Sequence, residues 1–366
     1  MKSHPIVALC LAMSLSFSLL EAQTQRDFFT DEDFERIEKI DSHVHINTWN
    51  TSFLDEAKEI NFRFLNIAVN SADPATVHLR HETGYHLHTQ RPEQLEMIAS
   101  FPLEGWNSPD WIEKTIRYID EVRGRGARGI KIWKNIGMEF RDDSGQLVMV
   151  DAPQLRPVID HIENRGLLLI GHLGEPKNCW LPLEQMTVNN DRSYFERHPE
   201  YHMFLHPEMP SYEDQIAARD RMVAQHPKLK FIGAHFGSLE WSVNALGAFL
   251  DRFPLAWVDT AARMGQLQYQ SNESREQVRS FLIKYQDRIV YGTDLGLATP
   301  TSPQGRFRAA VSRWKRDWSY LCTEKTIKVP ELDTPVKGLN LPAEVVRKIY
   351  SRNIKRLLPD AWSSTE

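Results

Sequence analysis

Short apolar runs, rich in β-branched and aromatic residues, recur along the chain and are separated by polar, turn-forming residues. Eight runs are long enough to form one strand each: residues 39–46, 63–70, 95–101, 129–134, 167–172, 230–235, 255–259 and 288–294. A continuous apolar run of this length is typical of a strand buried on both faces, as in a parallel sheet.

Between these runs, apolar residues follow the three- and four-residue spacing of an amphipathic helix. The clearest such segments are residues 111–123, 213–226 and 274–285. Strands that alternate with helices, with no linker between them, predict a single α/β domain with the (β/α)8 TIM-barrel fold. We expect this domain to span residues 23–366.

Two features depart from a minimal barrel. A helix over residues 31–39, capped by Thr30, is expected before the first strand. The connection between strands five and six spans residues 173–229, which is far longer than an ordinary loop. Its aromatic residues, among them Trp180, Tyr194 and Tyr201, suggest a lid or pocket wall.

One glycine motif needs a structural interpretation of its own. Residues 124–129 match the G-x-G-x-x-G pattern of dinucleotide-binding proteins. That motif must follow a strand and begin a helix, whereas here it follows a helix and begins a strand. We interpret it as a helix C-cap and turn.

The N-terminus has the pattern of a secretory signal peptide. Lys2 precedes an apolar run that ends near Ala22, so residues 1–22 are expected to be removed and the protein to be secreted or periplasmic. The net charge is −5, and it stays the same without this segment because one lysine and one glutamate leave together. This charge argues against a nucleic-acid partner, and no later apolar run is long enough to span a membrane.

The candidate chemistry gathers at the ends of the predicted strands. His43 and His45 close strand one, and their i, i+2 spacing places both side chains on one face. His172, His235 and Asp294 end strands five, six and eight. In a (β/α)8 barrel the active site lies at the C-terminal ends of the strands, so we expect these five residues to meet. The similar pair His86 and His88 stands in a polar stretch and is interpreted as part of a solvated loop.

Together these motifs resemble the amidohydrolase superfamily, in particular the amidohydrolase-related branch that includes aminocarboxymuconate-semialdehyde decarboxylase. The matching residues are Asp41-x-His43-x-His45, Gly171-His172, Ala234-His235 and Gly292-Thr293-Asp294, and the segment 341–358 is similar to the closing helix of that branch. The resemblance implies that His43, His45, His172 and Asp294 hold one divalent metal, with zinc expected. His235 would face the substrate or the attacking water, and Asp294 would also transfer protons. Three neutral nitrogens and one carboxylate suit Zn²⁺.

The number of metals depends on Lys131 in strand four. Some members of the superfamily carry a carboxylated lysine here that bridges two metals, and His172 and His235 would then hold the second ion. Alternatively, Lys131 forms an ion pair or binds a substrate anion. Lys134 is expected on the opposite face of a regular strand.

Two further residues follow predicted strands. Glu104 after strand three and Arg263 after strand seven are candidates for substrate contact, and Arg263 suits a carboxylate or phosphate. An ion pair at the barrel rim explains either residue equally well. The expected function is therefore a metal-dependent hydrolase of a small molecule. The alternatives are a metal-dependent decarboxylase or other lyase of a small carboxylic acid, and a non-catalytic binding protein on the same fold.

Overall fold

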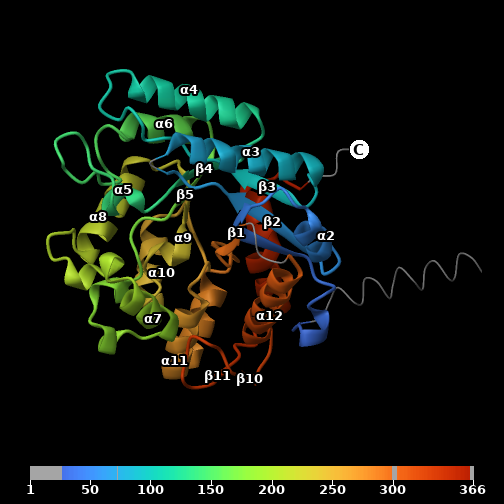
Figure 1. Ribbon diagram of the computed structural model, residues 1–366. Coiled ribbons are helices and arrows are strands. Elements are labelled where there is room, and N and C mark those ends of the chain that lie inside the picture. The colour runs from blue at the N-terminus through green and yellow to red at the C-terminus, as the bar shows by residue number, and fades with distance from the viewer. Residues whose placement is uncertain (1–26, 72, 299–302, 363–366) are drawn as a thin grey trace, which may run out of the picture.

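The computed structural model describes residues 27–71, 73–298 and 303–362, and within them parallel strands form the centre of the molecule (Figure 1). The strands are β1 (Lys39–Asn47), β2 (Phe62–Ile67), β3 (Leu95–Ile98), β4 (Gly129–Ile132), β5 (Leu168–Gly171), β6 (Lys230–Gly233), β7 (Ala256–Asp259), β8 (Ile289–Val290) and β9 (Leu295–Ala298). They pair in the orders β3-β2-β1-β9 and β4-β5-β6-β7-β8.

Two junctions close these sheets into a barrel. At one junction Ala99 bridges Ile130 in the parallel sense, and the Lys131 backbone N–H donates to the Ala99 carbonyl at 2.7 Å. At the other, the chain passes directly from β8 to β9, the Ser42 N–H donates to the Tyr291 carbonyl at 2.9 Å, and the Asp294 N–H donates to the His43 carbonyl at 2.8 Å. The predicted (β/α)8 fold is confirmed.

Strand eight differs from the prediction of one continuous strand over residues 288–294. It is split into β8 and β9, with Tyr291–Asp294 irregular and Asp294 in the left-handed region at φ 63°. The cause is a side chain on β1: the Asp41 carboxylate accepts hydrogen bonds from the Thr293 backbone N–H at 2.9 Å and from its hydroxyl at 2.6 Å. These bonds replace the regular pairing of the strand and turn Asp294 towards the barrel axis.

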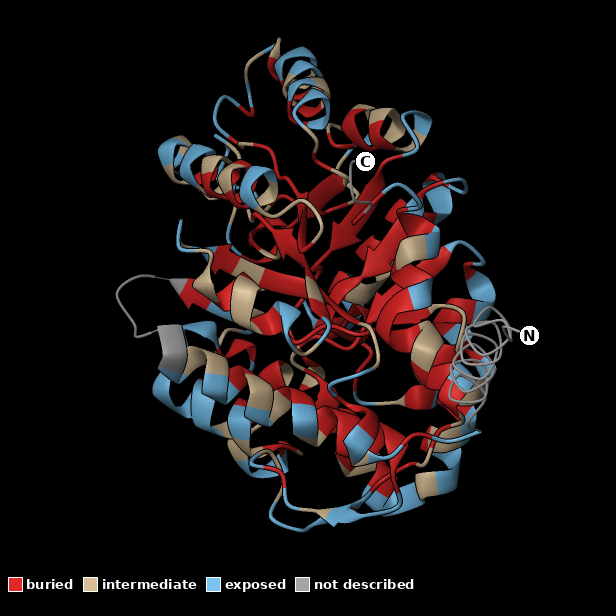
Figure 2. Ribbon diagram, turned by 90° about the vertical axis from the view of Figure 1, so that its right-hand side faces the viewer, coloured by how far each residue is buried: buried red, intermediate tan, exposed pale blue. Residues whose placement is uncertain are grey.

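Helices cover the outside of the barrel, and their buried faces meet the strands while their exposed faces point outwards (Figure 2). They are α2 (Ser52–Lys58), α3 (Pro74–Gln90), α4 (Trp111–Gly124), α6 (Arg156–Asn164), α8 (Tyr212–Gln225), α10 (Val243–Arg252), α11 (Met264–Lys284) and α12 (Pro303–Cys322). The predicted segment 274–285 is the second half of α11, which is kinked at Ser274. Short irregular turns, α5 (Asn135–Met138) and α9 (Ala234–Gly237), follow β4 and β6.

The insertion after β5 is folded against the barrel and not extended. It contains η2 (Lys177–Trp180), η3 (Leu183–Gln185), α7 (Asn189–Arg197), η4 (Pro199–Tyr201) and η5 (Met203–Leu205) before α8. Buried Met138, Cys179, Met186, Phe195 and Met203 form a small apolar cluster of its own beneath these turns. The chain closes with a hairpin of β10 (Thr326–Ile327) and β11 (Val336–Lys337), then α13 (Ala343–Arg347), the π-helical turn η6 (Lys348–Arg352) and α14 (Asn353–Leu357).

The helix expected over residues 31–39 is wrong. Only the 3₁₀ turn η1 (Asp31–Asp33) forms, with the capping box of Thr30 and Asp33, and Lys39 already begins β1. The Lys39 ammonium binds the carbonyls of Phe34 and Ile37, the latter at 2.5 Å. These carbonyls therefore serve a buried cation and do not continue a helix.

The loop assigned to His86 and His88 is also wrong, because both residues lie on α3. Leu87 between them is buried, and His88 Nδ1 lies 2.8 Å from the Leu95 carbonyl. By contrast, the glycine motif at residues 124–129 lies where α4 ends and β4 begins, as expected for a cap and turn.

Three remaining features complete the description. Cys179 and Cys322 are buried and free, so they do not pair. Among the described residues no helix has both the length and the apolar character needed to cross a membrane. The expected signal segment, residues 1–22, lies outside the described part of the chain.

Candidate active site

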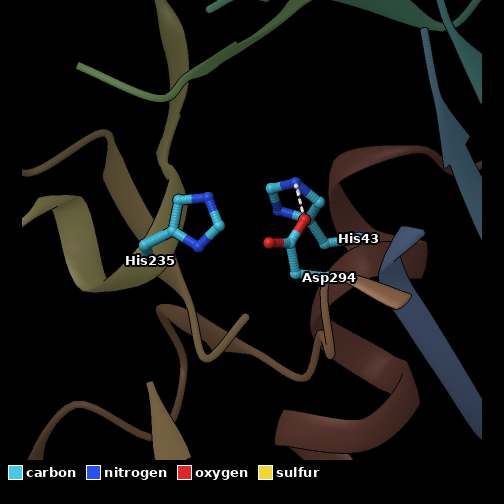
Figure 3. Close-up of side chains that lie close together, drawn as sticks. All are labelled: His43, His235 and Asp294. Carbon is cyan, nitrogen blue, oxygen red and sulfur yellow. Dashed lines mark ion pairs between the residues drawn. The ribbon is translucent and has the colours of Figure 1, made fainter. Parts of the chain in front are cut away.

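Five side chains from four strands meet at the C-terminal end of the barrel. His45 Nε2 lies 3.1 Å and His43 Nε2 lies 3.5 Å from Asp294 Oδ1, while His235 Nε2 lies 3.2 Å from His172 Nδ1. Figure 3 shows His43, His235 and Asp294 pointing towards one another, and one ligand atom from each lies within 4.8 Å of the other two. The five residues therefore meet, and His235, which was expected to face the substrate, is one of the three residues whose ligand atoms lie this close together.

Each strand-end histidine has its Nδ1 occupied by a neighbour. His43 Nδ1 lies 2.8 Å from Asp259 Oδ2, His45 Nδ1 lies 2.7 Å from the Ile67 carbonyl, and His235 Nδ1 lies 2.8 Å from the Ala261 carbonyl. Because a carbonyl or carboxylate accepts only, each Nδ1 must carry the proton, and Nε2 keeps its lone pair. This is the arrangement in which a histidine binds a metal through Nε2.

The remaining pair, His172 and His235, fits the same scheme. With its Nδ1–H on Ala261, neutral His235 accepts at Nε2, so His172 donates from its own Nδ1 and keeps a lone pair on Nε2. The Nε2 atoms of His43 and His172 are buried and have no hydrogen-bond partner in the described residues. A buried nitrogen without a partner is costly unless a further ligand completes it, so the donor set fits a divalent metal.

The surroundings of the cluster keep His43, His172 and His235 neutral and Asp294 ionised. Desolvation lowers the pKa of His43, His172 and His235 below that of a free imidazole. Burial opposes ionisation of Asp294, but the close approach of His45, His235 and His43 outweighs this cost and holds the pKa of Asp294 well below the ordinary value. Neutral imidazoles with a carboxylate are the protonation states that metal binding requires.

Two cavities flank the cluster and share Lys134, His172 and Asp294. The basic cavity, about 290 Å³, is lined by Arg80, Lys131, Trp133 and His45 in addition to the shared residues. The lid cavity, about 400 Å³, is lined by Glu175, Asp191, Tyr194, His235 and Arg263, so the insertion does form a wall of the site. Three cationic side chains and one carboxylate, that of Asp294, line the basic cavity. Several side chains of each charge line the lid cavity.

Lys131 and Lys134 both lie at the site. The Lys131 amine is buried without a hydrogen-bond partner in the described residues, and burial lowers its pKa to about 8 although Asp259 and Asp294 favour its charge. The placement of Lys134 on the opposite face is wrong because β4 ends at Ile132, and Lys134, which directly precedes the irregular turn α5, lines both cavities. There it forms an ion pair with Glu175.

The two candidates for substrate contact differ. Arg263 is buried in the wall of the lid cavity, and the charges of Asp191, Glu240 and Glu175 favour its cationic form against the cost of burial. Glu104 is exposed on the segment between β3 and α4, and it lines neither cavity. The structure therefore brings Arg263 to the cluster and leaves Glu104 outside it.

Sequence reasoning missed Asp259 and Arg80. Asp259 is the last residue of β7, so the rule that located the other strand-end residues also applies to it. Arg80 lies on α3, and its guanidinium donates to the Val69 carbonyl at 2.9 Å while also lining the basic cavity. A helical arginine of this kind leaves no signal in the sequence pattern.

A closed parallel barrel with histidines and an aspartate at its strand ends defines the class of metal-dependent (β/α)8 barrel enzymes. The family model described as Amidohydrolase matches residues 40–359, and the chain belongs to this family. The metal dependence of the family agrees with the cluster of His43, His235 and Asp294.

Solved structures support the fold. The crystal structure of 2,6-dihydroxybenzoate decarboxylase from Rhizobium is 14% identical with a TM-score of 0.51, over 88% of this chain and 99% of that chain. A structure of 2,6-dihydroxybenzoate decarboxylase complexed with 2,6-dihydroxybenzoate is 15% identical with the same TM-score, over 88% and 99% of the two chains. No curated protein sequence matches the chain.

Proposed function

We propose that the protein is a secreted, metal-dependent hydrolase of a small molecule. The observation that carries this proposal is the buried Nε2 of His43 beside Asp294, which has no hydrogen-bond partner among the described residues and lies at the end of the barrel where such sites form. His43, His45, His172 and Asp294 would hold one divalent ion, and zinc suits three nitrogens and one carboxylate. Removal of residues 1–22 is part of the proposal.

The bound metal would act as a Lewis acid that lowers the pKa of water to near 7. Asp294, kept ionised, accepts the proton of the attacking water and passes it to the leaving group. Because the Ala261 carbonyl holds Nδ1 of His235, this residue would reach the substrate through Nε2, and its contact with His172 Nδ1 would have to open first. In the neutral form this Nε2 is an acceptor, so His235 polarises a substrate oxygen only after it has gained a proton.

A second candidate is a metal-dependent decarboxylase or other lyase of a small carboxylic acid. The observation in its favour is the basic cavity, which Arg80, Lys131 and Lys134 line beside the cluster and where the Lys131 amine has no partner among the described residues. Such a cavity suits a substrate carboxylate. The two reactions differ in whether water enters the product.

The test uses the protein without its signal segment, loaded with zinc or manganese and assayed on a panel of small amides, lactones and carboxylic acids. Hydrolysis in ¹⁸O-labelled water places the label in the product, whereas decarboxylation releases CO₂. Asp294→Asn is expected to lower kcat by about 10²- to 10⁴-fold, the usual range for a lost general acid–base group. The matched control is Asp143→Asn, an exposed aspartate on a surface turn.

Either of two results would contradict the proposal. One is full activity of Asp294→Asn, and the other is a wild-type protein that takes up no zinc or manganese. The secretion step is tested separately by N-terminal sequencing of the exported protein, where a start other than residue 23 would refute the expected cleavage.

A further inference from the structure

Asp259 is buried at the end of β7, and it contacts two of the histidines in the cluster. Its Oδ2 lies 2.8 Å from His43 Nδ1. Its Oδ1 accepts two backbone hydrogen bonds, from the His235 N–H at 2.7 Å and from the Ala261 N–H at 3.0 Å. One carboxylate therefore connects the ends of β1, β6 and β7.

Asp259 is also connected to the ring of His235 through the backbone of Ala261. Asp259 holds the Ala261 N–H, and the Ala261 carbonyl accepts from His235 Nδ1 at 2.8 Å. The backbone of His235 and Phe236 is left-handed, with φ of 59° and 55°, a conformation that costs free energy for residues other than glycine. The bond from the His235 N–H to Asp259 offsets part of this cost and keeps the side chain aimed at the cluster.

We propose that Asp259 is a positioning residue that sets the proton position of His43 and the orientation of His235, so that one carboxylate controls both. The inference rests on the proposed function for its consequence, since a metal would bind to Nε2 of His43. The Asp259 carboxylate can only accept a hydrogen bond, so the proton of neutral His43 must be on Nδ1. The lone pair is then on Nε2.

The geometry makes Asp259→Asn an unusually selective change. Two backbone N–H groups point at Oδ1, so the amide oxygen must stay there, because the amide NH₂ would oppose two donors. The NH₂ group then faces His43 Nδ1 and donates to it. His43 must adopt the other tautomer, with its proton on Nε2, and this tautomer cannot bind a metal through Nε2.

The experiment compares the wild type, Asp259→Asn and Asp259→Glu in the full mature chain. The first measurement is zinc affinity by competition with a chelator, where Asp259→Asn is expected to lose about 10- to 100-fold, the usual cost of such an outer partner. The second is ¹H–¹⁵N NMR of the metal-free, ¹⁵N-histidine-labelled protein, where one imidazole should change from the Nδ1–H to the Nε2–H form. Asp259→Glu keeps an acceptor, so it should keep the wild-type tautomer and recover part of the affinity.

The matched control is Asp317→Asn. Asp317 is another buried aspartate, and its carboxylate accepts a hydrogen bond from the Tyr291 hydroxyl at a distance of 2.8 Å and contacts none of the histidines of the cluster. It should change neither zinc affinity nor the histidine tautomers. An Asp259→Asn protein with wild-type tautomers and zinc affinity within about threefold would overturn the proposal, as would an Asp259→Glu protein with the inverted tautomer. The NMR measurement needs neither metal nor substrate, so it tests Asp259 even if the proposed hydrolase activity fails.

Discussion

The two ring nitrogens of His43 have different surroundings, and this difference decides its chemistry. Asp259 engages Nδ1, and Nε2 faces Asp294 without a hydrogen-bond partner in the described residues. Burial removes the alternative of solvation, so the lone pair is available for a metal. At the scale of a single residue, the function of the site depends on which nitrogen carries the proton.

Lys131 provides a test of the metal count at the same scale. We expect Lys131→Met to keep about one metal per chain and to raise KM for an anionic substrate by about 10- to 100-fold, since a hydrogen bond to a charged group contributes about 1.5–3 kcal/mol. The reason is that its buried amine lines the basic cavity and has no hydrogen-bond partner within the part of the chain that the structure describes. Elemental analysis and steady-state kinetics are the measurements.

The control for this change is Lys114→Met, which removes an exposed lysine from a surface ion pair with Asp110. Two metals in the wild type and one in Lys131→Met would contradict the one-metal site. That result would identify Lys131 as a carboxylated bridge, with His172 and His235 around the second ion.

At the scale of elements, close packing of strand eight against β1 places Asp294 at the site. A Cβ atom on Gly292 would lie 2.9 Å from His43 Cβ. Gly292→Ala should therefore push the two segments apart, lower the free energy of unfolding by about 1–3 kcal/mol and weaken zinc binding. Urea unfolding and chelator competition measure these effects.

Gly296→Ala is the matched control, because a Cβ atom there meets nothing within 4 Å. It lies on β9, which also pairs with β1. If both variants bind zinc as the wild type does, close contact between Gly292 and His43 is not what positions the ligand.

The contact between Asp317 on α12 and Tyr291 in strand eight predicts that the stability of the protein depends on pH. Burial raises the pKa of Asp317 on α12 from 3.8 to about 6, although Arg313 and the Tyr291 hydroxyl lower it. Between pH 3.8 and about pH 6, Asp317 is protonated in the folded protein and ionised in the unfolded chain. The free energy of unfolding therefore falls as the pH rises through this range. In Asp317→Asn the side chain cannot ionise. The free energy of unfolding of this variant should therefore rise relative to the wild type between pH 3.8 and about pH 6, by about 3 kcal/mol at most.

Urea unfolding of both proteins between pH 4 and pH 8 checks this expectation. The difference in the free energy of unfolding should grow up to about pH 6 and then stay constant. A difference that does not depend on pH would show that Asp317 ionises in the folded protein as it does in water.

At the scale of the whole molecule, metal binding should stabilise the entire barrel, because the ligands come from β1, β5 and strand eight and meet only in the folded chain. A metal at about 100 times its Kd adds about 2.7 kcal/mol. We therefore expect a chelator to lower Tm by about 5 °C, because 1 kcal/mol shifts the Tm of a large domain by about 2 °C. Calorimetry with and without added zinc is the measurement.

His172→Ala serves as the control, since it should show a smaller chelator effect than the wild type. A wild-type protein that contains metal and yet melts at the same temperature after chelation would argue that the metal is not bound by residues from different strands.

Much of this architecture follows from the order of residues. The eight apolar runs match the strands of the barrel, and His43, His45, His172, His235 and Asp294 meet because parallel strands bring their ends together. Two of the errors arose where a buried side chain bound backbone groups and changed the local structure. Asp41 interrupts strand eight through Thr293, and the buried ammonium of Lys39 takes carbonyls that a helix would have used.

The sequence by itself determined the fold and five of the strand-end residues at the site, because hydrophobic periodicity is a local property. Only the tertiary structure decided which nitrogen of each histidine is free, that Asp259 controls His43 and His235, and that Arg80, Lys131 and Lys134 share one cavity. These relations join residues that are far apart in the chain. They depend on donor–acceptor distances of about 3 Å between side chains of neighbouring elements, which the sequence pattern does not specify.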